Sequence, residues 1–191
     1  MDILNVNFSD KKSIKAVFLD RDGVLNNAIV IKGKPHPPAC LEELVLSAGV
    51  LEATCRLKES GYLLVVVTNQ PDVARGATSK ESVEQINQYL GKLLKIDEFR
   101  TCYHDNLDNC ECRKPKPGAI LQVARSRGID LTQSFMVGDR WRDIEAGQAA
   151  GLKTVFIDYD YEERRPITYD YKATSLLGAL PFILGEKNEK N

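Results

Sequence analysis

The sequence lacks the features that place a protein in a membrane or on a nucleic acid. No apolar run approaches the about 18 residues that a membrane-spanning helix needs. Lys and Arg together number 26 against 27 Asp and Glu, giving a net charge of −1, whereas proteins that bind a nucleic-acid backbone concentrate Lys and Arg. Residues 1–13 contain no continuous apolar core and do not resemble a secretory signal. We therefore expect a cytoplasmic protein that binds neither membranes nor nucleic acid.

The cysteines do not form the pattern of a disulfide framework. The chain has 5 cysteines, an odd number, and three of them crowd into residues 102–112. This spacing suits a metal site in a reducing compartment better than disulfides. The chain also has no internal repeat and no low-complexity linker, and its 191 residues suit one folded unit. We expect a single domain over residues 1–191 that acts as a monomer, with the tail KNEKN at 187–191 frayed.

What the sequence does contain is an alternation of strand-like and helix-like segments. Continuous apolar runs indicate strands buried on both faces of a parallel sheet, and their alternation with helices indicates an α/β fold. We predict a Rossmann-like three-layer sandwich with a central parallel sheet and no large cap domain. Segments 27–46 and 102–118 fit neither pattern, and we expect both over the same end of the sheet. The expected strands are 16–20, 63–67, 135–137 and 154–157, with a weaker one at 99–103, and the expected helices are 49–60, 80–95, 119–127 and 142–150.

The first expected strand runs directly into two acids, in the stretch AVFLDRDGVLN at 16–26. Ligands of parallel sheets bind at the carboxyl ends of the strands, where Asp20 falls, with Asp22 two residues beyond and Gly23 allowing a sharp turn. A carboxylate in this place can attack phosphorus and form an aspartyl phosphate. The second acid can protonate the leaving oxygen and later activate water, and Mg²⁺ would offset the repulsion between the anions. Taken alone, the stretch is equally a solvated turn at a strand end.

Three further places carry groups that suit phosphoryl chemistry. TNQ at 68–70 offers a hydroxyl and amides that can donate hydrogen bonds to phosphoryl oxygens, and FMVGDRWRD at 135–143 supplies Asp139 as a second carboxylate for Mg²⁺. A lysine of RKPKPG at 113–118 can neutralise the nucleophile and the transferring group. Each has a plain alternative, namely a polar turn, a helix-start acid at Asp143 or a solvated basic turn. The four motifs in this order are far more specific than any one of them.

Four potential metal ligands lie close together in the pattern Cys102-x-His104-x5-Cys110-x-Cys112. Three thiolates and one imidazole with no open position form a tetrahedral structural Zn²⁺ site. A redox pair and a set of unrelated buried thiols are the alternatives. Zinc here would order the loop that carries the lysine of RKPKPG without touching substrate, so we expect a zinc-bound loop.

The strand-end motifs resemble those of the haloacid dehalogenase-like phosphatases. DRDGV, TNQ, the lysine of RKPKPG and GDRWRD are similar to the first to fourth motifs of that family, and the resemblance covers residues 17–157. It implies a Mg²⁺-dependent phosphatase. The resemblance implies Asp20 as nucleophile and Asp22 as general acid and base. It implies that Thr68 binds the phosphoryl group and that Lys114 is the stabilising cation, with Lys116 as the alternative. Mg²⁺ would be held by Asp20, the backbone carbonyl of Asp22 and Asp139, and Asp143 would orient these ligands without binding the ion.

The cysteine-rich loop narrows the resemblance to one branch of the family. The pattern CxH…CxCRKPxPG resembles the zinc-loop phosphatases that act on D-glycero-D-manno-heptose 1,7-bisphosphate or on histidinol phosphate. The branch implies a small phosphate ester as the partner of this chain, contacted by Asn69, Arg75 and Arg113. We expect hydrolysis of the heptose bisphosphate at position 7, with histidinol phosphate as the alternative substrate.

Two interpretations without enzymatic activity stay open at the level of sequence. Response-regulator receiver domains also place a phosphorylatable aspartate, a threonine and a lysine at strand ends. They do not place an acid two residues after the aspartate, as Asp22 stands after Asp20. A zinc-stabilised binding module that has lost catalysis is the second interpretation, and the four intact motifs count against it.

Overall fold

The computed structural model describes residues 13–186. The expectation that residues 1–13 are not a secretory signal falls almost wholly on residues 1–12, and the expectation of a frayed tail falls on 187–191. Both lie outside the described residues. Within 13–186, none of the helices combines the length and the apolar character needed to cross a membrane.

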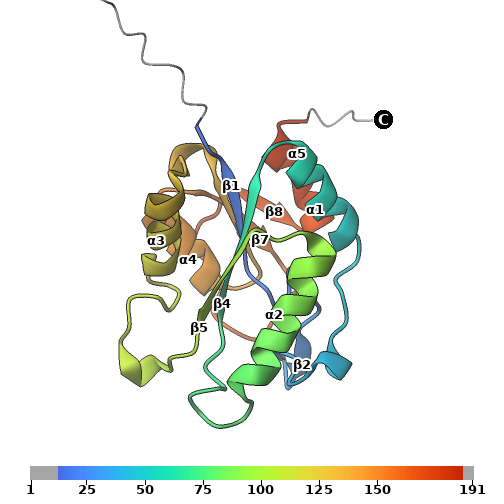
Figure 1. Ribbon diagram of the computed structural model, residues 1–191, viewed down its shortest axis with the longest axis vertical. Helices are drawn as coiled ribbons and strands as arrows, with labels where there is room; N and C mark the ends of the chain where they lie inside the picture. The colour runs from blue at the N-terminus through green and yellow to red at the C-terminus, as the bar shows by residue number, and fades with distance from the viewer. Residues whose placement is uncertain (1–12, 187–191) are drawn as a thin grey trace, which may run out of the picture.

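A six-stranded sheet lies at the centre of the molecule (Figure 1). Its order is β5-β4-β1-β6-β7-β8, and every neighbouring pair is parallel. Because β1 lies between β4 and β6, the carboxyl ends of these three strands meet at one edge. The strands are β1 (Ala16–Leu19), β4 (Leu63–Asn69), β5 (Glu98–Cys102), β6 (Phe135–Gly138), β7 (Lys153–Ile157) and β8 (Tyr171–Ala173).

Helices cover both faces of the sheet, which confirms the predicted three-layer α/β architecture (Figure 1). Successive side chains of a strand point to opposite faces. In β1, Val17 and Leu19 therefore join one apolar core, while Ala16 and Phe18 join the other. Helices α1 (Val50–Glu59), α2 (Lys80–Leu94) and α5 (Leu176–Leu184) pack on the first core, and α3 (Gly118–Arg127) and α4 (Trp141–Ala150) on the second.

Every strand and helix expected from the sequence is present, but three features were not predicted. β8 has three residues and α5 contains Pro181, so neither shows a clear period. The third feature is an antiparallel hairpin of β2 (Ile29–Ile31) and β3 (Lys34–His36) within the expected loop 27–46. The hairpin is mostly exposed, so burial imposes no recognisable apolar pattern on its sequence. Three short 3-10 helices, Leu41–Glu43, Asn106–Asp108 and Leu131–Gln133, complete the described elements.

The two irregular segments both reach the carboxyl edge of the sheet. The hairpin and the segment 102–118 line one cavity there, as expected from their positions after strands. Within the described residues no insertion forms a cap domain over this edge. The site is therefore covered only by short segments.

Candidate active site

β1 ends at Leu19, directly before Asp20, and Asp20 is 7% exposed. The backbone N–H of Asp20 still donates to the carbonyl of Val137 in β6 at 2.9 Å, so the sheet fixes the start of the following loop. Gly23 turns the chain with φ +90°, and a Cβ at this residue would lie 1.9 Å from Oδ2 of Asp139. Glycine tolerates positive φ, and here it lets the loop after β1 approach the acid after β6.

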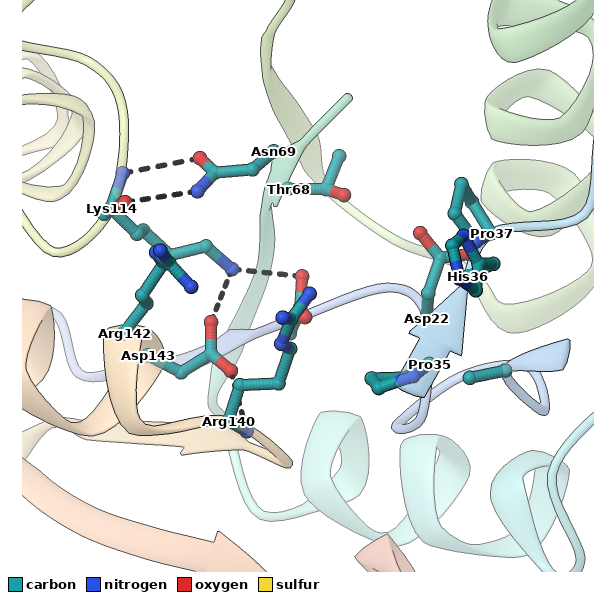
Figure 2. A pocket seen from close by; sticks show the side chains of 12 residues that line it. Asp22, Pro35, His36, Pro37, Thr68, Asn69, Lys114, Arg140, Arg142 and Asp143 are labelled. Atoms are coloured by element: carbon teal, nitrogen blue, oxygen red, sulfur yellow. Dashed lines mark hydrogen bonds and ion pairs between the residues drawn. The ribbon is translucent and has the colours of Figure 1, made fainter. Parts of the chain in front are cut away.

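Lys114 carries a buried positive charge into this edge of the sheet. Its Nζ donates to Oδ1 of Asp20 at 2.8 Å and lies 2.6 Å from Oδ1 of Asp143 (Figure 2). Burial alone would lower the pKa of Lys114, but the charges of Asp143 and Asp20 outweigh burial and raise this pKa. The backbone of Lys114 is clamped by Asn69, which donates to its carbonyl at 3.0 Å and accepts from its N–H at 3.1 Å. The amide thus fixes the ammonium group beside the end of β1.

Three buried carboxylates converge beside this lysine. One oxygen each of Asp20, Asp139 and Asp143 lies within 4.8 Å of the others. Burial, reinforced by Asp143, raises the pKa of Asp20 to about 7. Burial and the charge of Asp20 raise the pKa of Asp139 well above its ordinary value. Among the described residues, both oxygens of Asp139 are buried without a hydrogen-bond partner, and such a cluster fits a hard divalent cation with oxygen ligands.

We expect Mg²⁺ to raise the melting temperature more at pH about 8 than at pH about 5.5. A raised carboxyl pKa means that the folded protein binds the proton more tightly than the unfolded chain does. This stabilisation is fully present below the unfolded pKa of 3.8 and is lost as pH rises through about 7 for Asp20. At high pH the carboxylates repel each other and a cation relieves the repulsion, whereas at low pH protons compete with it. Thermal denaturation with and without Mg²⁺ measures the difference. Asp139→Asn should remove most of the difference, and equal shifts at both pH values would contradict the cation site.

The carboxylate of Asp22 accepts hydrogen bonds from three side chains. Its Oδ1 accepts from Arg21 Nε at 3.1 Å and from Asn26 Nδ2 at 3.0 Å. Its Oδ2 accepts from Arg21 Nη2 at 3.1 Å and from Gln70 Nε2 at 2.7 Å. Arg21 is fully buried, and its Nη1 donates to Oδ1 of Asn87 in α2 at 3.1 Å. Gln70 was expected to contact phosphoryl oxygens, and its bond to Asp22 was not predicted. The support from Arg21, Asn26 and Asn87 was not predicted either, although the position of Arg21 between two acids was a visible signal.

Asp20, Asp22, Lys114 and Asp143 line a cavity of about 60 Å³ (Figure 2), whereas Asp139 is not among its lining residues. Figure 2 shows Lys114 and the first residues of α4 on one side and the hairpin residues on the other. The segment 27–46 was expected over this end of the sheet, and the structure adds that it lies there as a hairpin whose residues line the cavity. Of the lining residues, Asp20, Asp22, Thr68, Asn69, Lys114 and Asp143 were predicted individually. Ala28, Pro35, His36 and Pro37 belong to the segment expected here, whereas Arg140 and Arg142 were not predicted to line the site.

Three basic residues considered for the site do not line this cavity. Arg75 pairs with Asp105 at 2.6 Å, and its side chain is 47% exposed. Lys116 pairs with Glu111 at 2.8 Å. Arg113 lines a neighbouring cavity of about 220 Å³. The structure therefore brings only Lys114 of the RKPKPG stretch to Asp20.

The cysteine cluster forms a compact cage after β5. Cys112 Sγ lies 3.4 Å from Cys110 Sγ, 3.5 Å from Cys102 Sγ and 3.4 Å from His104 Nδ1. Cys102 Sγ lies 3.7 Å from both Cys110 Sγ and His104 Nδ1. Ligands about 2.3 Å from a tetrahedral ion stand about 3.7 Å apart, whereas a disulfide needs about 2.05 Å. The four side chains therefore have the arrangement of a metal site.

Two curated relatives resemble most of this chain. The D-glycero-beta-D-manno-heptose-1,7-bisphosphate 7-phosphatase of Pasteurella multocida (strain Pm70) is 37% identical over 169 residues, which cover 83% of this chain and 87% of that protein. The enzyme of the same name from Helicobacter pylori (strain ATCC 700392 / 26695) is 39% identical over 145 residues, covering 73% of this chain and 80% of that protein. A family described as HAD-hydrolase-like matches residues 111–178.

A solved structure shares the fold and contains ligands. The crystal structure of D,D-heptose 1,7-bisphosphate phosphatase from B. bronchiseptica, complexed with magnesium and phosphate, is 27% identical to this chain. It covers 91% of this chain and 100% of its own, with a TM-score of 0.78. The likeness thus extends over most of both molecules.

Proposed function

We infer the reaction of this chain from its family: it belongs to the haloacid dehalogenase-like hydrolases, and it is a phosphatase, that is, a phosphoric monoester hydrolase. Because the chain is a phosphatase, the two interpretations without enzymatic activity, a receiver domain and an inactive binding module, are rejected. The reaction that we propose is removal of the 7-phosphate of D-glycero-D-manno-heptose 1,7-bisphosphate, in heptose biosynthesis, through an aspartyl phosphate. The observation that carries the proposal is the 37% identity to an enzyme of that name over 83% of the chain.

Asp20 attacks the phosphorus atom in the proposed mechanism. Lys114 donates to its Oδ1 at 2.8 Å, which favours the ionised nucleophile and places a positive charge beside the incoming phosphoryl group. Thr68, 1% exposed and lining the cavity, offers its hydroxyl to a phosphoryl oxygen. Asp22 protonates the leaving oxygen and then activates the water that hydrolyses the aspartyl phosphate. Asp20, Asp139 and the backbone carbonyl of Asp22 would hold Mg²⁺, which when bound neutralises charge between the anionic nucleophile and the anionic ester.

Several further assignments complete the proposal. We propose that Zn²⁺ occupies the cysteine cage as a structural ion and that residues 1–191 form one domain, active as a monomer in the cytoplasm. Asn69 contacts substrate from the cavity wall, where it also holds the backbone of Lys114. Arg75 is the more remote proposed contact, because it would have to exchange Asp105 for substrate.

Kinetics on matched substrates test the proposed substrate. We expect kcat/KM for the heptose bisphosphate to exceed that for histidinol phosphate by at least about 100-fold, because sites with specific polar contacts discriminate strongly against molecules that leave those contacts unmade. Both anomers of the bisphosphate should be compared. A preference for histidinol phosphate would overturn the substrate while leaving the phosphatase assignment intact.

Arg113→Ala should lower kcat/KM for the heptose bisphosphate about 10- to 100-fold, the range of a hydrogen bond to a charged group. The loss on p-nitrophenyl phosphate should be much smaller. The guanidinium of Arg113 donates to Oδ1 of Asn106 at 3.0 Å and to the carbonyl of His104 at 3.1 Å, so neutral groups orient it and its charge stays available. Lys116→Ala, on the same loop, is the matched control. Equal losses on both substrates would show that Arg113 is not a specificity contact.

A further inference from the structure

Arg142, the second residue of α4, is held in a fixed orientation at the mouth of the site. Its guanidinium carbon lies 4.3 Å from the centroid of the Trp141 ring. Arg164 lies over the same ring at 4.2 Å. A guanidinium stacked on an aromatic ring is oriented before any ligand arrives. Figure 2 shows Arg142 on the same side of the cavity as Lys114.

Arg142 differs from the neighbouring arginines because it forms no ion pair with an acid among residues 13–186. Arg140 pairs with Glu163, and Arg164 pairs with Glu145. Arg142 makes no ion pair or side-chain hydrogen bond with any residue in 13–186. Burial and the charge of Arg140 lower the pKa of Arg142, and although Glu163 and Asp143 act in the opposite direction, the surroundings on balance disfavour its charged form at a net cost. An anion bound here would relieve that cost.

A second cavity, which we call the α4 cavity, lies between the cysteine-rich loop and the start of α4. Its volume is about 220 Å³, several times the roughly 30 Å³ of a liquid water molecule. It is lined by Arg113 and Arg142, and it shares Lys114 and Arg142 with the catalytic cavity. The charge of Arg113 contributes to the lowered pKa of Arg142, so the two guanidinium groups lie close enough to repel each other. One carboxylate, Asp105, also lines this cavity, but it pairs with Arg75 at 2.6 Å. Two guanidinium groups that form no ion pair among the described residues thus face a cavity next to the catalytic one.

We propose that Arg142, together with Arg113, binds a second anionic group of the substrate in the α4 cavity while the first phosphate lies at Asp20. The enzyme then prefers small esters with two phosphates, and Arg142 reads the phosphate that is not cleaved. Guanidinium groups suit phosphate because their planar N–H donors bind two oxygens at once. Stacking on Trp141 reduces the entropy lost when the ligand binds. The inference rests on the proposed phosphatase site, but it does not depend on the identity of the sugar.

Arg142→Gln tests the subsite, with Arg164→Gln as the matched control. Both arginines lie over Trp141, but Arg164 has Glu145 as partner and lines neither cavity. With p-nitrophenyl phosphate as reporter, glucose 1,6-bisphosphate should inhibit the wild type at least about 10-fold more tightly than glucose 6-phosphate, as expected for an added charged hydrogen bond. Arg142→Gln should lose most of that preference, and Arg164→Gln should keep it.

Two outcomes would overturn the subsite: a wild-type enzyme that does not prefer the bisphosphate, or a preference that survives in Arg142→Gln. Melting temperatures of both variants exclude loss of the fold as the cause. Turnover of the heptose bisphosphate decides the proposed function separately. If that ester is not cleaved while the bisphosphate preference still depends on Arg142, only the sugar assignment fails.

Discussion

Asp20→Asn is expected to abolish turnover, lowering kcat by more than about 10⁴-fold, because removal of a covalent nucleophile has effects of that size or larger. The amide keeps the size of the side chain but cannot form the phosphorylated intermediate. The fold should persist. Burial already raises the pKa of Asp20 to about 7, so loss of its charge removes a repulsive anion, and Lys114 keeps Asp143 at 2.6 Å. Phosphate release and circular dichroism measure the two effects.

Asp158→Asn is a matched control for this substitution. Asp158 follows β7 as Asp20 follows β1, but its carboxylate pairs with Lys172 at 2.7 Å. This variant should retain near wild-type turnover. In the wild-type enzyme, borohydride applied during turnover should trap an acyl phosphate, and the trapped product should be missing from Asp20→Asn. A folded Asp20→Asn enzyme that still releases phosphate at the wild-type rate would remove the nucleophile assignment.

Cys110→Ser should remove zinc from the protein and lower its activity. The cage holds the loop immediately before Arg113 and Lys114, so losing the ion frees the segment that positions the catalytic cation. Structural zinc sites contribute directly to folding free energy. A loss of only about 2 kcal/mol corresponds to roughly 4–8 °C in the melting temperature of a chain of this size. Elemental analysis should fall from about one zinc per chain to nearly none, and kcat should fall with it.

Cys55→Ser separates a zinc effect from a general effect of cysteine replacement. Cys55 is exposed on α1, and its thiol contacts Glu59 instead of the cage. Its replacement should change neither zinc content nor melting temperature measurably. Unchanged zinc in Cys110→Ser would reject the four-ligand site.

The polar ends of the strands could be predicted because the rule that places them is local. Asp20, Thr68 and Asp139 each come at or just after the end of an apolar run, and the order β4-β1-β6 brings these ends together. A parallel sheet leaves few other positions for them. The cysteine cage was likewise visible, because all four side chains come from one short segment.

Pairings between distant polar groups could not be predicted in the same way. Asn87 reaches Arg21 across 66 positions of sequence, and no period or motif connects them. Arg75, predicted as a substrate contact, pairs with Asp105 from another loop. Arg142 forms no ion pair within residues 13–186, whereas Glu163 and Glu145 pair with Arg140 and Arg164. Such pairings depend on which side chains the folded chain brings together. They bear on substrate specificity more than on the chemistry of the nucleophile.

Replacing Asp22 would leave a positive charge stranded in the interior. Arg21 is 0% exposed, and among residues 13–186 its ion-pair partner is Asp22 alone. Removing one member of a buried pair costs about 3–5 kcal/mol, out of a total stability of about 5–15 kcal/mol for a typical domain. An Asp22→Ala protein would therefore lose activity for two separate reasons, missing proton transfer and partial unfolding. Combining it with Arg21→Met would restore much of the stability and leave the chemical defect exposed on its own.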